Sequence, residues 1–258
     1  MRIILTLFFL LFGSAAWAAE KPVCSRTFTL AYHDHGMLYS TATDEGIDKD
    51  IALEMIKRSG CKVDISVLPR SRIWLLIESG KLDFSMSGIT NDERDKFAGF
   101  AWYLYNKYYL LARKDSKVKS LSDFEKNKNL EIGAIRSFRY SPNANLFVDK
   151  LTDQKRIIDV TDHQQLLNMI SLNRIQGMII EPFNYSQIDS NLLEKITNII
   201  DTGDAPVLHG LIMSKKSLSD AEQKKWGAII DDMHKDGTLL RIMRKYFDAE
   251  MAKAMVTF

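Results

Sequence analysis

The chain of 258 residues carries 35 lysine and arginine residues against 33 aspartate and glutamate residues, a formal net charge of +2 at pH 7. This near neutrality excludes the concentrated positive charge that nucleic acids and acidic membrane surfaces require of a binding partner. With 46% hydrophobic residues the chain can bury a sizeable core, and its length allows one large domain or two small ones.

The first 18 residues predict a secretory signal peptide. Met1 and Arg2 form a short positive start, residues 3–12 are an apolar run, and Ala16-Trp17-Ala18 fits an A-x-A cleavage site. The apolar run is too short to span a bilayer, which disfavours a membrane anchor. No cysteine follows the cleavage site, which disfavours a lipoprotein. We therefore expect export to an oxidising compartment after cleavage near Ala18.

Cys24 and Cys61 each stand just before a predicted strand, at residues 27–32 and 62–68. If these strands are parallel neighbours joined by one crossover helix, both cysteines lie at the same edge of the sheet. A disulfide between them is then geometrically reasonable in an exported protein. The alternative is two buried free thiols. A zinc site is not expected, because no histidine pair lies nearby.

Residues 27–113 alternate between strands and helices. Strands are predicted at 27–32, 62–68 and 82–86, and helices at 48–59 and 71–79, with a polar loop at 33–46. This alternation is typical of right-handed βαβ units around a parallel sheet. The apolar run at 108–113 then leads out of this first unit.

The same alternation restarts after the polar segment 114–122. Strands are predicted at 130–135, 156–160 and 176–180, and helices at 143–151 and 162–172, the latter with Asp162 as N-cap. Another helical stretch begins at Glu181-Pro182. An apolar strand at 207–213 crosses back, and helices at 220–235 and 238–247 end the chain. We expect a discontinuous lobe 1 (residues 19–113 and 207–258) and a continuous lobe 2 (residues 114–206).

Residues 78–105 contain the strongest candidate site. A helix ends at Ser79-Gly80, a short apolar strand follows, and Ser87-Gly88 forms a turn before Thr90 and Arg94. A strand that ends in small hydroxyl residues before a capped helical turn presents free N–H and O–H groups at one point. Arg94 adds a planar fork that can hold a carboxylate through two hydrogen bonds. The stretch therefore predicts a site for an acid group.

This stretch also resembles the type 2 periplasmic solute-binding proteins, family 3, the receptors of ABC importers for amino acids and similar small polar solutes. Residues 79–83, SGKLD, match the S-G-K-x-D element of that family, and Arg94 takes the place of the arginine in its T-x-x-R element. The chain departs from the pattern in one way: Thr90 lies four residues before Arg94, and Asn91 occupies the usual threonine position. Residues 167–181 and 236–247 carry weaker matches.

The resemblance implies an α/β fold of the type 2 periplasmic binding protein kind, in which two mostly parallel sheets flanked by helices close about two hinge strands. It implies a monomeric periplasmic receptor that takes a small polar, carboxylate-bearing solute to an ABC permease in the inner membrane. No cofactor and no catalytic residue are expected. Two alternatives stay open, a sensor subunit and a dehydratase or lyase of a cyclic acid, for which Glu181 is the one acid/base candidate.

Further ligand-binding candidates lie in the expected first lobe. Ser87 and Thr90 are expected as hydroxyl donors beside Arg94, and Arg72 is expected to point from its helix start toward the same strand ends. Arg70 stands where many members of the family have a tryptophan, which favours an anionic ligand. The polar loop adds Tyr32, Asp34 and Tyr39. The alternatives are a surface ion pair of Arg94 with Asp92 or Asp95, an N-cap at Thr90 and a solvated Arg72.

In the expected second lobe the candidates are Arg139, Tyr140 and Glu181. Residues 135–142 follow a strand at the place of a small-residue turn in the family, so Arg139 is expected as a second clamp and Tyr140 as a stacking surface. The alternative is an exposed loop. Glu181 stands where many amino-acid receptors carry the aspartate that binds the ammonium group of the ligand.

The sequence His33-Asp34-His35 invites comparison with a metal site. Adjacent residues rarely all face one ion, and no third histidine has matching spacing, so no metal is expected. The chain also lacks a G-x-S-x-G nucleophile motif and a glycine-rich phosphate loop. These features leave a binding protein as the leading interpretation.

Overall fold

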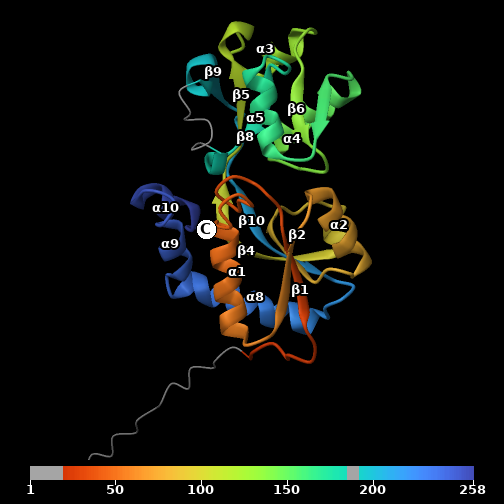
Figure 1. The fold of residues 1–258 in the computed structure, drawn as a ribbon, viewed down its shortest axis with the longest axis vertical. Helices are drawn as coiled ribbons and strands as arrows, with labels where there is room; N and C mark the ends of the chain where they lie inside the picture. Colours follow the sequence, from red (N-terminus) through yellow and green to blue (C-terminus); the bar gives the residue numbers. More distant parts are fainter. Residues whose placement is uncertain (1–19, 185–191) are drawn as a thin grey trace, which may run out of the picture.

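The computed structural model of the protein describes residues 20–184 and 192–258. Figure 1 shows two lobes, each built on one five-stranded sheet with helices packed around it. The expected signal peptide and residues 185–191 of the helical stretch expected after Glu181-Pro182 lie outside the described residues. Within the described ranges, no helix combines the length and apolar character needed to cross a membrane.

The first sheet has the strand order β2-β1-β3-β10-β4. β1 pairs in parallel with β2 and β3, as βαβ units require, whereas β10 pairs antiparallel with β3 and β4. The aromatic run before residue 107 is a strand, β4, which the sequence analysis did not predict. The elements of this lobe are β1 Phe28–Tyr32, α1 Ile47–Ser59, β2 Val63–Val67, α2 Arg70–Ser79, β3 Phe84–Gly88, η1 Arg94–Lys96, β4 Ala98–Asn106, β10 Val207–Ser214, α8 Asp220–Lys235, α9 Thr238–Met243 and α10 Ala249–Met255.

The second sheet has the strand order β7-β6-β8-β5-β9. β6 pairs in parallel with β7 and β8, and β5 pairs antiparallel with β8 and β9, so this sheet is also mixed rather than mostly parallel. Its elements are β5 Tyr109–Arg113, η2 Lys114–Ser116, α3 Leu121–Lys126, β6 Ile132–Ile135, α4 Pro142–Asp153, β7 Ile157–Val160, α5 His163–Ser171, β8 Gly177–Ile180, η3 Pro182–Asn184, α7 Leu193–Ile196 and β9 Thr197–Asp201.

The boundary expected after residue 113 differs from the sheet membership. β5 belongs to the second sheet, where Leu110 and Leu111 are fully buried, so the chain crosses between the lobes at Lys107-Tyr108. The return crossing runs from β9 to β10, and the two crossings lie side by side, since Val207 pairs with Asn106 and Tyr109 pairs with Asp201. The sequence of a buried apolar strand does not indicate which sheet the strand joins, because the hydrophobic core of either lobe would bury it equally well.

The C-terminal helices pack on the first sheet. Trp226 on α8 is fully buried, with its ring 5.2 Å from that of Phe28 on β1 and 4.7 Å from that of Phe84 on β3. A capping box at Ser219 and Glu222 satisfies the first N–H groups of α8, which explains its sharp start. The core of this lobe therefore contains residues from both the N-terminal and the C-terminal parts of the chain.

Cys24 and Cys61 form a disulfide, as predicted. The two cysteines precede β1 and β2, and these strands pair in parallel from Phe28 opposite Val63 onward. Both sulfurs therefore lie at the same edge of the sheet, with the Cα atoms 5.1 Å apart. The bridge connects the start of the described chain to the end of the first βα unit.

Candidate functional site

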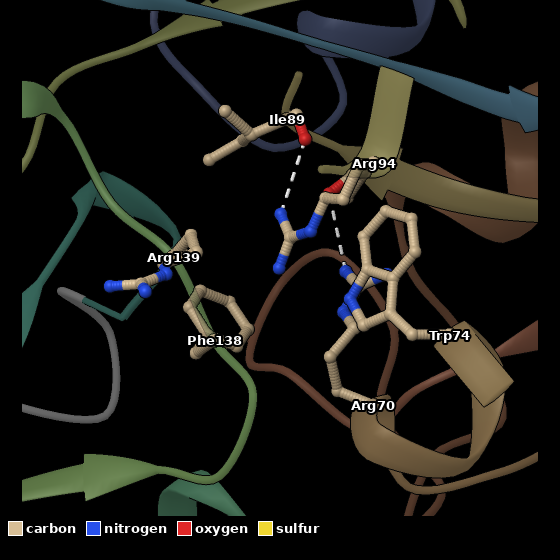
Figure 2. A pocket seen from close by; sticks show the side chains of 7 residues that line it. Arg70, Trp74, Ile89, Arg94, Phe138 and Arg139 are labelled. Carbon is tan, nitrogen blue, oxygen red and sulfur yellow. Dashed lines mark hydrogen bonds between the residues drawn. The ribbon is translucent and has the colours of Figure 1, made fainter. Parts of the chain in front are cut away.

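A small pocket lies between the two lobes at the end of β3. Figure 2 shows its wall, with Arg70, Trp74 and Arg94 on one side and Phe138 and Arg139 on the other. Ser87 and Ile89, at and beyond the end of β3, complete the lining. The cavity measures about 10 Å³, room for a single water molecule. The structure therefore shows the lobes closed on a nearly filled cleft.

Arg94 is buried in this pocket. Its Nη1 donates to the carbonyl of Ile89 at 3.1 Å, and its Nη2 donates to the carbonyl of Ser137 at 3.0 Å. Its guanidinium lies 4.0 Å from the centre of the Trp74 ring, a cation–π contact. Ser137 follows β6 of the second lobe, so Arg94 links the two lobes directly.

The surface ion pair considered for Arg94 does not form. Asp95 accepts instead from the hydroxyl of Thr90, and both side chains are exposed. Asn91 accepts from the N–H groups of Glu93 and Arg94 and so orders the turn before η1. Asn91 thus caps this turn, and Thr90 lies outside the pocket.

Arg70, rather than the expected Arg72, enters the pocket. Arg70 is buried and donates to the carbonyls of Met86 and Ser87 at 3.1 and 3.2 Å and bonds to Nε2 of His33 at 3.0 Å. Arg72 is exposed, because residues two apart on a helix face nearly opposite sides. The signal for Arg70 was its spacing of four from Trp74, which puts both on the inward face.

The pocket has an excess of positive charge. Burial and, to a smaller extent, the neighbouring cations Arg70 and Arg139 lower the pKa of Arg94 to about 9. Burial likewise lowers the pKa of Arg70 to about 10. Arg139 is half-buried and pairs with Asp149 at 2.6 Å, while no acidic residue lines this pocket. With these pKa values Arg94 and Arg70 stay protonated at neutral pH, so the arrangement favours an anion.

Ser87 lines the pocket, but its hydroxyl and backbone N–H form hydrogen bonds with residues that do not line it. The hydroxyl donates to Asp48 at 2.8 Å, and the backbone N–H donates to the hydroxyl of Tyr103 at 2.5 Å. Tyr103 donates to the same oxygen of Asp48 at 2.7 Å, and these bonds hold Ser87 at a left-handed φ of 53°. Burial raises the pKa of Asp48 to about 6. The expected role of Ser87 as a ligand donor requires one of these bonds to break.

Glu181 lies in an adjacent cavity and is fully engaged. One of its oxygens contacts Nε2 of His35, and the other accepts from the side-chain amide of Asn106. Burial by itself raises the pKa of Glu181, but the charge of His35 and the hydrogen bond between them outweigh burial and hold this pKa below its usual value. Tyr140 lines the same cavity, edge-on to Tyr108 with ring centres 5.5 Å apart.

Four of the five histidines gather between the lobes: His33, His35, His163 and His209 are all buried. His35 stacks on Phe138 at 5.2 Å and meets His163 edge-on at 5.3 Å. Burial lowers the pKa of His33, His163 and His209, the last to about 4. In the described part of the chain, no three metal-ligating side chains are placed to hold an ion.

The remaining candidates lie away from Arg94. Tyr32 stacks on Tyr39 at 4.7 Å inside the first lobe, and Tyr39 donates to Asp44 at 3.0 Å. Asp34 is exposed and lines a second, larger pocket of about 220 Å³, which Arg70 also lines. The structure thus brings Arg94, Ser87 and Arg139 together. It adds residues that the sequence analysis did not assign to the site, namely Arg70, Trp74, Ile89 and Phe138.

Known proteins resemble this chain along most of its length. Residues 30–249 match the family model of bacterial extracellular solute-binding proteins, family 3. The probable amino-acid-binding protein YxeM of Bacillus subtilis is 23% identical over 233 residues, which cover 88% of this chain and 82% of that protein.

Two solved structures have the same fold. One is a substrate-binding protein of an ABC uptake transporter from Streptococcus pneumoniae with bound histidine, with a TM-score of 0.70, 16% identity, and coverage of 86% of this chain and 92% of that one. The other is the arginine-, lysine-, histidine-binding protein ArtJ of Geobacillus stearothermophilus, with a TM-score of 0.72, 17% identity, and coverage of 86% and 95%. The family model and these proteins are described as solute-binding, which goes against a lyase. The chain belongs to the bacterial extracellular solute-binding proteins, family 3.

Proposed function

We propose that the protein is a periplasmic receptor that closes over a small carboxylate-bearing solute, an amino acid or a related compound, and delivers it to an ABC importer. One observation carries the proposal: Arg94 is buried between the lobes, bonded to both of them, and has no acidic partner among the described residues. The known binders of histidine, arginine and lysine among the similar structures support this class of solute.

Binding requires the lobes to open, because the pocket beside Arg94 holds no more than a water molecule. The two crossings at Lys107-Tyr108 and between β9 and β10 act as the hinge. An acid group of the solute takes the place of the Ser137 carbonyl on Arg94 and exchanges a neutral acceptor for a charged one. Closure is then favoured because the solute contacts both lobes at once.

A thermal-shift screen of amino acids, small organic acids and amines tests the proposal on the mature protein. A solute present at about 100 times its dissociation constant adds about 2.7 kcal/mol to the free energy of unfolding. For a chain of this size that raises the melting temperature by roughly 5–10 °C. If no acid-bearing solute raises it, the proposed function is wrong.

Transport is tested separately from binding. We expect deletion of the gene to abolish high-affinity uptake of the radiolabelled solute, and the Arg94→Ala variant to fail to restore it. Uptake that is unchanged by deletion, with binding intact, would favour a sensor over a transport receptor. Mass spectrometry of the solute after incubation should recover it unchanged.

A further inference from the structure

Two buried arginines of the inter-lobe pocket lack a charged partner. Arg70 and Arg94 are 4% and 8% exposed, and their hydrogen-bond partners are carbonyl oxygens and a histidine nitrogen. Neither forms an ion pair with a described residue, whereas the more exposed Arg26 and Arg58 both do. Removing a cation from water without an opposite charge costs several kcal/mol.

Arg156 shows that a buried arginine without an ion pair does not by itself indicate a bound anion. It is also buried without an ion pair, but its guanidinium makes five hydrogen bonds to carbonyl and amide oxygens. A guanidinium has five N–H donors, so the donors of Arg156 are accounted for. Arg94 makes two such bonds and Arg70 makes three with the described residues, which leaves donors of both side chains for a ligand.

The position of Arg70 in α2 also favours a bound anion. Arg70 is the first residue of this helix, where the partial charge of the helix end is positive and a cation is unfavourable. An anion bound at this place gains from both the guanidinium and the helix end. Arg70 also lines both the small pocket of Arg94 and the neighbouring pocket of about 220 Å³, so a solute that extends from one into the other meets it.

A singly charged solute leaves one of the two cations without a directly bonded negative partner. The third arginine of the pocket, Arg139, does not change the balance, because Asp149 already pairs with it. Phe138 separates the small pocket from the cavity of Glu181, whose two oxygens are held by His35 and Asn106. The charges of Asp48 and Glu181 also act on Arg70, but Asp48 is held by Ser87 and Tyr103, and neither carboxylate forms an ion pair with Arg70 or Arg94. Both guanidinium groups therefore lack a direct negative partner among the described residues.

We propose that the solute closed between the lobes carries two negative charges, one held by Arg94 and the other by Arg70. This rests on the proposed function as a receptor of carboxylate-bearing solutes and narrows its ligand class to dianions. Dicarboxylates and phosphate monoesters share this chemistry.

Matched ligands that differ by one acid group test the proposal on the unaltered mature protein. Calorimetry compares succinate with succinamate, glutarate with glutaramate, and glutamate with glutamine; glycerol 3-phosphate against glycerol tests the phosphate source. We expect at least one diacid or phosphate monoester to bind roughly 30-fold or more tightly than its less charged counterpart. Equal affinity within every pair overturns the proposal.

Variants then assign the second charge to Arg70. Arg70→Gln should weaken the dianion by roughly 30-fold or more and its amide counterpart by less than about 3-fold. Arg72→Gln, two residues along the same helix and exposed, is the matched control and should change neither. Equal losses for dianion and amide in Arg70→Gln contradict the assignment. If Arg70→Gln fails to fold, the ligand pairs on the unaltered protein still decide the charge.

The two proposals fail in different ways. Tight binding of an amino acid without an acidic side chain, such as glutamine, arginine or histidine, in preference to every dianion overturns the dianion inference and leaves the receptor function standing. Failure of all acid-bearing solutes to bind removes the proposed function and the dianion inference together.

Discussion

At the scale of single residues, Arg94 is buried between the lobes, with contacts that the sequence did not predict. Its guanidinium lies on the face of Trp74 and reaches across to the second lobe through Ser137. In the closed cleft the guanidinium and an acid group of the solute both lose water, so their pairing depends on good geometry. The planar fork of arginine supplies that geometry, and an ammonium group does not.

We expect Arg94→Ala to weaken binding of the strongest acid found in the screen by about 2–5 kcal/mol, or roughly 30-fold to several thousand-fold. Arg94→Lys should recover only part of this loss, because it keeps the charge without the fork. Thr90→Val is the control, since its exposed hydroxyl bonds only to Asp95. Calorimetry that finds full affinity in Arg94→Ala would place the acid group elsewhere.

The buried carboxyl group of Asp48 makes the free energy of unfolding depend on pH, and this effect does not require a ligand. Its pKa of about 6 in the folded protein lies above the ordinary value of 3.8, so between these pH values the folded state binds more protons than the unfolded state. Stability therefore falls as the pH rises through this window, by an amount on the order of 1–3 kcal/mol. Asp48→Asn should remove this slope in thermal unfolding across the window, whereas the exposed Asp92→Asn should keep it.

At the scale of elements, the disulfide holds β1 and β2 together at the edge of the first sheet. Bridging Cys24 to Cys61 closes a loop with a sequence separation of 37 residues. In the chain-entropy description such a bridge stabilises the fold by roughly 3–4 kcal/mol. β2 is the outermost strand and most of its residues are exposed, so the bridge is a large share of what keeps it in place.

Replacing both cysteines by serine should lower the melting temperature by about 6–16 °C for a chain of this size. Reductant should lower the melting temperature of the natural sequence by a similar amount and leave that of the double variant unchanged. Thiol titration of the denatured, unreduced protein should find none. Two reactive thiols would contradict the bridge.

At the scale of the whole molecule, the buried histidines make the stability of the closed protein depend on pH. His33, His163 and His209 have lowered pKa values, so the unfolded protein binds more protons than the closed protein below pH 6.5. The stability is fully present above about pH 6.5 and is lost as the pH falls toward the folded pKa of His209, about 4. The charges that face His209 are those of Glu181, which oppose this shift, and of Arg70 and His35, which support it.

We expect the closed form to weaken between about pH 6.5 and 4.5, with a falling melting temperature and a radius of gyration that rises as the lobes part. His209→Gln should reduce the change by up to about 3 kcal/mol, because glutamine does not titrate. His234→Gln, a histidine outside the cleft, is the control. The slope from Asp48 has the opposite sign but comes from one group against three. A melting temperature that rises steadily as the pH falls would contradict this account.

Much of the fold was predictable from sequence patterns that span only a few neighbouring residues. The alternation of apolar runs predicted every helix and strand of the first βα units, the N-cap at Asp162 was correct, and the helix at 220–235 has the predicted bounds. Each of these features depends on neighbours within a few residues. β4 and the membership of β5 were not predictable in this way, because strand pairing is decided by partners far along the chain.

The sequence by itself therefore determined the α/β class and the bridge between the cysteines, since spacing and local order are enough for these, and it selected Arg94 as a candidate ligand-binding residue. Only the tertiary structure decided which arginine of α2 faces the cleft, that Glu181 is held by His35, and that Arg94 bonds to Ser137. His35 and Glu181 stand 146 positions apart, and Arg94 and Ser137 stand 43 apart. Contacts of this kind form only when the two lobes meet, and the spacing of apolar residues along the chain does not specify them.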